Sequence, residues 1–446
     1  MEQHNFAAYK AGTFSTDISN LQIADKLFVP EDMPAFVHEY CHYIQDVTTI
    51  SAIFGFSLWM RDVVALTNIF SDGEQKTISI PLNRDFYGET INKFRKFYSL
   101  YCGDANVVLN LDYSNHTFIK RHLSINEINL DGKEQKLAIN EIEISNRPER
   151  IFFGLIVLQE IQAYYAQQLA ERKLSSVSFS VYAENLPSFP YKFGDFLFQQ
   201  FEINIDLDSK FILIDLCLDT IQATSVFMEV LEKLKGQTVT YFGDKRIDFA
   251  SIVEECRKSC SYSTEEALEN ILPDLKTWSR EPGRKYLTEA ISWYVNQVEL
   301  VYNLKKLTSP TFFSMSFCMD WENFAIFFRC FPSPAYLDNG TLCRTVSISS
   351  DEEDSEFIKN FEAATTIWSH RILYDFLCSE NPSQLNDRCH CPLYENCHIR
   401  PEIGEDYICK TAPWEIIKNA KKITCQYGMA AHSFGLWQNN LEIKLD

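Results

Sequence analysis

Five consecutive residues near the amino terminus have the types and the spacing of a metal-dependent hydrolase. His38 and His42 lie four positions apart, and Glu39 directly follows the first of them. On an α-helix, positions four apart share a face, so both imidazoles can bind one metal ion. Zinc held in this way lowers the pKa of a bound water molecule, and a neighbouring carboxylate can accept the proton. The pattern predicts His38 and His42 as metal ligands and Glu39 as general base.

The residues around this motif favour a helix. The segment 29–34 contains prolines and acidic residues, which are typical of a helix start. Apolar residues follow the motif at helical spacing. We expect a helix that runs to about Gly55. In the alternative interpretation, the two histidines are ordinary core residues. Both of them bracket a glutamate, however, that would otherwise be costly to bury.

A catalytic zinc ion normally has three protein ligands and one open position. No further histidine follows His42 at a short spacing, but Glu160 lies in the apolar, helix-forming segment 154–166. A carboxylate within such a helix needs a partner, and a metal ion is one. The small side chains of Ala163 and Ala166 would let this helix approach the first one closely. We therefore expect Glu160 to be the third ligand. The alternative is a glutamate on a polar stripe of its own helix.

An H-E-x-x-H motif followed by a later helix with E-x-x-A resembles the gluzincin group of zinc metallopeptidases. It also resembles a group of poorly characterised bacterial H-E-x-x-H proteins. The similarity covers about residues 30–55 and 150–172. It implies that His38, His42 and Glu160 bind a catalytic zinc ion and that Glu39 is the general base. The two parts of the motif lie 118 positions apart, far more than in compact gluzincins, so we expect a folded insertion between the two helices.

The intervening sequence contains segments that alternate or cluster as β-strands do. Between two of them lies Asp131-Gly132, which is typical of a hairpin turn. We therefore expect a small antiparallel sheet within about residues 76–145, between the two active-site helices. The expected strands are 77–81, 107–112, 117–120, 125–128 and 137–144.

The sequence as a whole indicates an α+β protein that is mostly helical. We expect a zincin-like pair of active-site helices with a small antiparallel sheet in a metallopeptidase-like domain over residues 1–309. Residues 310–446 are expected to form a C-terminal helical domain with a cysteine-rich metal site. Among the other expected helices are 215–235, 286–307 and 356–378.

Cysteines are concentrated within residues 378–409, in a loop-like segment with little core of its own. Four thiolates at this density are typical of a structural zinc site, which would stabilise such a segment. An iron–sulfur cluster uses the same ligands and is the second interpretation; free thiols or disulfides are the third. The expected ligands of this second metal site are Cys389, Cys391, Cys397 and Cys409.

Composition limits the classes of partner. The chain has 446 residues, and its 34 phenylalanines indicate a substantial core. Its 41 basic and 61 acidic residues give a net charge of −20, which argues against binding to nucleic acid. The amino terminus lacks a basic segment followed by an apolar one, and no uninterrupted apolar run approaches the length of a membrane span. We expect a cytoplasmic protein without a membrane partner.

These observations predict an intracellular zinc metallopeptidase whose substrate is a peptide or a protein. The alternative is a catalytically silent, peptidase-like module that keeps its zinc and binds a regulatory protein partner. Catalysis also needs a group that stabilises the oxyanion. The sequence offers four candidates, namely Tyr164, Tyr165, Tyr191 and His122.

Overall fold

The H-E-x-x-H segment forms helix α1 (Met33–Thr48) in a computed structural model of the chain, and helix α2 (Ile50–Ser71) follows it. The predicted single helix to Gly55 is wrong, because the backbone of Thr49 is extended between the two helices. The Thr49 hydroxyl donates to the carbonyl of Gln45 at 2.9 Å and accepts from the amide of Ala52 at 3.4 Å. One side chain thus caps both helices where the chain turns.

The structure describes residues 8–9, 14–17, 23–24, 27–28, 32–71, 77–80, 82, 92, 95–104, 111, 115–130, 133–147, 150–174, 186–236, 248–260, 264–280, 285–338, 341–344, 355–378, 409–410, 425–436 and 439–443.

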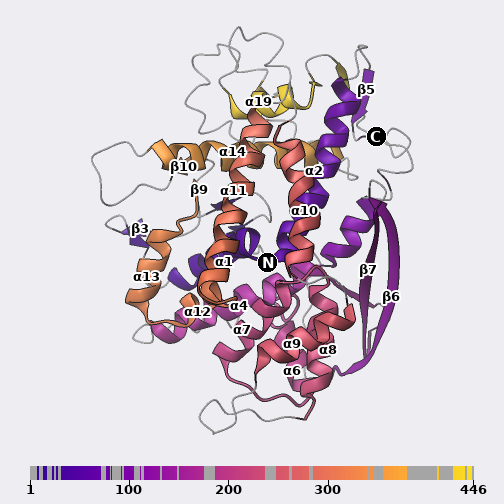
Figure 1. Ribbon diagram of the computed structural model, residues 1–446, viewed down its shortest axis with the longest axis vertical. Coiled ribbons are helices and arrows are strands. Elements are labelled where there is room, and N and C mark those ends of the chain that lie inside the picture. The colour runs from indigo at the N-terminus through magenta and orange to yellow at the C-terminus, as the bar shows by residue number, and fades with distance from the viewer. Residues whose placement is uncertain are drawn as a thin grey trace.

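Helix α1 lies in the interior of the protein (Figure 1). One of its faces packs on aromatic rings. Tyr40 is fully buried, and its ring centroid lies 4.9 Å from that of Phe328 and 5.9 Å from that of Phe317. These rings come from helices α12 (Phe312–Cys318) and α13 (Trp321–Cys330). Burial of such rings contributes much of the free energy that stabilises a hydrophobic core. This packing fixes the rotation of α1 about its own axis.

Helix α11 (Lys285–Leu307) stabilises the carboxyl end of α1, where no basic residue of α1 itself lies. The ammonium group of Lys305 donates to the carbonyl of Thr48 at 2.7 Å and to the carboxylate of Asp219 at 3.2 Å. The hydroxyl of Tyr294 donates to the carbonyl of Asp46 at 2.9 Å. The last carbonyls of a helix lack partners within it, and a cation there is favourable.

Helix α4 (Leu155–Lys173) lies against α1 and begins at Gly154, where the backbone passes very close to Gly103. A Cβ atom on Gly154 would lie 2.4 Å from the amide nitrogen of Gly103, so a side chain cannot fit. Gly103 itself has a φ of +78°, which favours glycine. The start of α4, six residues before Glu160, therefore packs directly against the backbone of residues 102–103.

A three-stranded antiparallel sheet precedes α4 in the chain and has the order β6 (Phe118–Leu130), β7 (Lys133–Ile144), β8 (Ile151–Phe153). This confirms a mostly helical α+β fold with a small antiparallel sheet between α1 and α4. Two predicted strands, 117–120 and 125–128, are one continuous strand. The predicted hairpin turn at Asp131-Gly132 lies outside the described residues.

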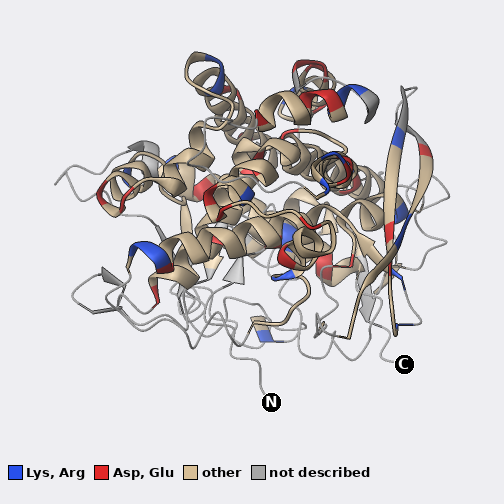
Figure 2. Ribbon diagram, turned by 90° about the horizontal axis from the view of Figure 1, so that it is seen from below, with Lys and Arg blue, Asp and Glu red and all other residues tan. Residues whose placement is uncertain are grey.

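The predicted strand at 77–81 forms β5 (Thr77–Ile80), but it does not join this sheet. It pairs in parallel with β11 (Asn440–Ile443), more than 350 positions later. The long β6–β7 ribbon instead stands at one side of the helices, which Figures 1 and 2 both show. Most of the predicted strand at 107–112 lies outside the described residues.

The predicted helix over 215–235 is also wrong, since it is divided into α7 (Leu207–Leu218) and α8 (Ala223–Leu234). Gln222 lies in the break, and its side-chain amide bonds the backbone of β7 at Lys136 and Ala138. The break thus docks the helices onto the sheet. The predicted helices at 286–307 and 356–378 are confirmed as α11 and α14 (Ser355–Cys378).

The remaining elements are α6 (Phe193–Gln200), α9 (Phe249–Cys260), α10 (Thr264–Trp278), α19 (Gln426–Ser433), β1 (Ala8–Tyr9), β2 (Ser15–Asp17), β3 (Ile23–Ala24), β4 (Leu27–Phe28), β9 (Ala335–Asp338) and β10 (Thr341–Arg344). β2 pairs in parallel with β9, and β9 pairs with β10. A strand of the predicted first domain, β2, thus pairs with a strand of the predicted second domain, β9. The division at residue 309 stays a prediction.

Helix α2 has the length and the apolar composition of a membrane span. Core helices can also have this length and composition. Its most apolar 18-residue window is 89 % buried inside the protein. In Figure 2 the ribbons of the central helices are mostly tan, with charged residues at scattered positions. Within the described chain, α2 packs as a core helix.

Candidate metal site

The two histidines of the motif lie on one face of α1, as their spacing predicts. Their ring centroids are 5.0 Å apart, and their planes are inclined by 77°. His38 is 6 % exposed and His42 is 8 % exposed. Both rings are therefore buried side by side on α1.

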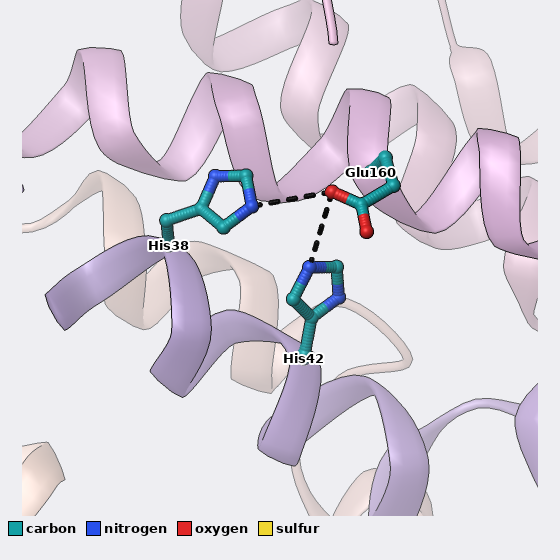
Figure 3. Close-up of side chains that lie close together, drawn as sticks. All are labelled: His38, His42 and Glu160. Carbon is teal, nitrogen blue, oxygen red and sulfur yellow. Dashed lines mark hydrogen bonds and ion pairs between the residues drawn. The ribbon is translucent and has the colours of Figure 1, made fainter. Parts of the chain in front are cut away.

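Glu160 of α4 meets both rings with one oxygen atom (Figure 3). Its Oε2 lies 3.3 Å from Nε2 of His38 and 3.4 Å from Nε2 of His42. Zinc bonds of about 2.0–2.2 Å in a tetrahedron place neighbouring ligand atoms roughly 3.3–3.6 Å apart. The three side chains offer ligand atoms that all lie within 4.8 Å of one another. These three residues could therefore hold a metal ion.

The electrostatics of this cluster favour positive charge at its centre. Burial disfavours a charged imidazole, but Glu160 and Glu39 outweigh it and raise the pKa of His42 to about 9. Burial likewise disfavours a charged carboxylate, but His42 and His38 hold the pKa of Glu160 well below its usual range. A half-buried carboxylate kept ionised between two imidazoles is an environment that suits a bound cation.

A chain of hydrogen-bonded amide side chains begins at Nδ1 of His42, the ring nitrogen that faces away from Glu160. Nδ1 of His42 lies 2.8 Å from Oε1 of Gln45. Nε2 of Gln45 donates to the carbonyl of Gln159 at 3.0 Å and to Oε1 of Gln162 at 2.8 Å. Nε2 of Gln162 in turn lies 3.4 Å from Oδ1 of Asp215 on α7. Gln45 and Gln162 are each 2 % exposed, so this network is buried.

The sequence analysis did not single out these residues. Gln45 follows His42 by three positions and so shares its face of α1, which was the one signal available. Gln162 and Asp215 come from other helices, and nothing in the local sequence connects them to the motif.

Glu39, the predicted general base, is half-buried on α1. Its charge is among the causes that raise the pKa of the His42 ring and that of the Tyr191 phenol. Cys41 beside them is 1 % exposed, and burial together with nearby carboxylates raises the pKa of its thiol well above the usual range. It is therefore a neutral core residue.

Of the four predicted oxyanion groups, Tyr191 is the one that contacts His38 among the described contacts. Its ring centroid lies 5.7 Å from that of His38. Burial, Glu160 and Glu39 raise the pKa of its phenol well above the usual range, so the phenol keeps its proton and can donate a hydrogen bond.

The other three candidates bind partners outside the histidine–glutamate cluster. The hydroxyl of Tyr165 donates to Asp195 at 3.0 Å, and that of Tyr164 accepts from Gln168 at 2.7 Å. His122 lies on β6, 2.6 Å from Glu143 on β7.

His370 illustrates the ordinary core histidine. It is fully buried, and burial lowers its pKa to about 4. Its Nδ1 donates to the carbonyl of Thr366 at 2.7 Å, one turn earlier on α14. Unlike His42, it has no carboxylate from the described residues against its ring that would favour a positive charge.

The second predicted metal site lies mostly outside the described residues. Three of its expected ligands fall there, namely Cys389, Cys391 and Cys397. The fourth, Cys409, is buried, with 5 % of its surface exposed. Among the residues that the structure describes, only His38, His42 and Glu160 form a group of three or more with metal-binding geometry. The cysteine site with zinc or an iron–sulfur cluster stays a prediction.

A comparison with protein-family models, with curated proteins and with solved structures finds no match for this chain.

Proposed function

We propose that this chain is a zinc-dependent hydrolase that cleaves peptide bonds, with a gluzincin-like set of ligands. The observation that carries the proposal is the meeting of His38, His42 and Glu160 at 3.3 and 3.4 Å, from two helices far apart in the sequence. Two imidazoles and one carboxylate are the ligand set of catalytic rather than structural zinc sites, because one position stays open for water or substrate.

Zinc bound by these three side chains would supply a Lewis acid that lowers the pKa of water and polarises a carbonyl group. Residues of the chain would supply proton transfer and stabilisation of the oxyanion. The carboxylate of Glu39 accepts a proton from the attacking water and passes it to the leaving amine. The phenol of Tyr191 donates a hydrogen bond to the oxygen atom on which negative charge develops.

The experiment that tests this function combines metal counting with cleavage of a peptide library. We expect the purified chain to bind zinc, to cleave peptides from a proteome digest, to lose this activity with 1,10-phenanthroline and to regain it with added zinc. New amino termini identified by mass spectrometry would give the specificity. Bound zinc without cleavage of any peptide would instead support the silent, partner-binding module.

Replacing Tyr191 with phenylalanine tests the proposed oxyanion group. We expect kcat to fall by about 10²–10³-fold, the usual effect of removing one oxyanion donor, with little change in zinc content. Tyr165→Phe is a matched control, because this phenol bonds Asp195 instead. Equal activities of Tyr191→Phe and wild type would exclude Tyr191 from this role.

A further inference from the structure

The amide network behind His42 has a direction that two backbone carbonyls determine. The carbonyl of Gln159 can only accept a hydrogen bond, so the amide nitrogen of Gln45 must face it at 3.0 Å. The amide oxygen of Gln45 must then face His42, and it lies 2.8 Å from Nδ1. Since that oxygen can only accept, Nδ1 of His42 has to carry the proton.

The next amide is oriented in the same way. Nε2 of Gln162 faces the carbonyl of Phe211 at 3.5 Å and Oδ1 of Asp215 at 3.4 Å. Its oxygen is therefore left to accept from Gln45 at 2.8 Å. Reversal of either amide would place two acceptors or two donors against each other in a buried position, which is costly.

We propose that Gln45, held by Gln162 and Asp215, is a positioning residue that keeps His42 in the tautomer with its Nε2 lone pair toward the metal. This inference rests on the proposed metal site and adds the residues that set its affinity. Partners of the outer nitrogen of a metal-binding histidine orient the ring and raise its basicity. Here neutral amides perform this role, and they connect α1 to α4 and α7.

The two ligands differ in this respect. Within the described part of the chain, the buried Nδ1 of His38 has no hydrogen-bond partner, whereas that of His42 belongs to the amide network. His42 is therefore the imidazole whose orientation the described protein fixes before metal binds. A change at Gln45 should act on the metal through His42, whose Nδ1 it contacts.

Competition between the full-length protein and a chromophoric zinc chelator tests this assignment. The relevant zinc equivalent is the one that His42→Ala removes. We expect Gln45→Met, which keeps the length of the side chain, to weaken this equivalent by about 10- to 100-fold. We expect Gln162→Met to weaken it by about two- to tenfold, the effect of one neutral hydrogen bond. Gln167→Met is the matched control, because this buried glutamine of α4 bonds only Glu171 among the described contacts.

A spectroscopic measurement separates tautomer control from a general loss of stability. In zinc-loaded protein labelled with ¹⁵N-histidine, His42 should show a protonated, hydrogen-bonded Nδ1 and a metal-bound Nε2. The downfield proton signal of Nδ1 should disappear in Gln45→Met and persist in Gln167→Met. Unchanged zinc affinity in both Gln45→Met and Gln162→Met, or Nδ1 bound to zinc in wild type, would overturn the assignment. If wild type bound no zinc at this site, the proposed function itself would fail.

Discussion

Replacing Glu39 with glutamine should lower kcat for peptide cleavage by about 10²–10⁴-fold, the usual contribution of a general base. Glutamine has the size of glutamate but cannot accept the proton of the attacking water. Glu39 is half-buried and lies next to a ligand histidine without belonging to the ligand cluster. We therefore expect the zinc content to remain that of wild type. Steady-state kinetics and metal analysis of the same preparation measure both quantities.

The matched control for this change is Glu171→Gln on helix α4. Glu171 is also partly buried, and burial raises the pKa of its carboxyl, but its recorded contact is with Gln167 rather than with the histidines. Its variant should retain wild-type kcat. Full activity of Glu39→Gln with zinc bound would show that another group accepts the proton, and the proposed mechanism would be wrong.

The part of the site that could be predicted from the sequence is the part encoded by local spacing. His38, Glu39 and His42 occupy one turn of helix, and helix geometry alone brings the two rings together. Glu160 was reached in another way, because a catalytic zinc ion needs a third ligand, a carboxylate within an apolar helix needs a partner, and the E-x-x-A pattern resembles that of gluzincins. The structure brings the predicted ligands His38, His42 and Glu160 together. The roles assigned to them stay proposals.

The features that sequence analysis missed depend on tertiary contacts. Gln162 and Asp215 matter because α4 packs on α1 and α7 packs on α4, and no local pattern encodes that. The break at Thr49 depends on a hydroxyl that caps two helices, which a run of apolar residues at helical spacing conceals. Similarly, β5 has the alternation of a strand, but its partner β11 lies at the far end of the chain. Periodicity predicts that an element exists and does not predict its neighbour.

Replacing Glu160 with glutamine should remove the zinc equivalent that depends on His38 and His42. An amide oxygen is neutral and is a poorer zinc ligand than a carboxylate, so two imidazoles would remain. The loss of affinity should exceed the roughly 10- to 100-fold that follows loss of an outer partner of a ligand. Metal analysis after gel filtration measures the stoichiometry. Thermal unfolding adds a second readout, because zinc at a thousand times its Kd stabilises wild type by about 4 kcal/mol.

The variant should lose this stabilisation by zinc while its metal-free form stays folded. Glu160 contacts the rings of both histidines from the other helix, and its Oε2 lies at nearly equal distances from them. A hydrogen-bonded carboxylate in a metal-free protein would show the same contacts, so the dependence of zinc binding on this one charge separates the two cases. Retention of a full zinc equivalent by Glu160→Gln, together with its loss in His38→Ala, would mean that the third ligand is another residue.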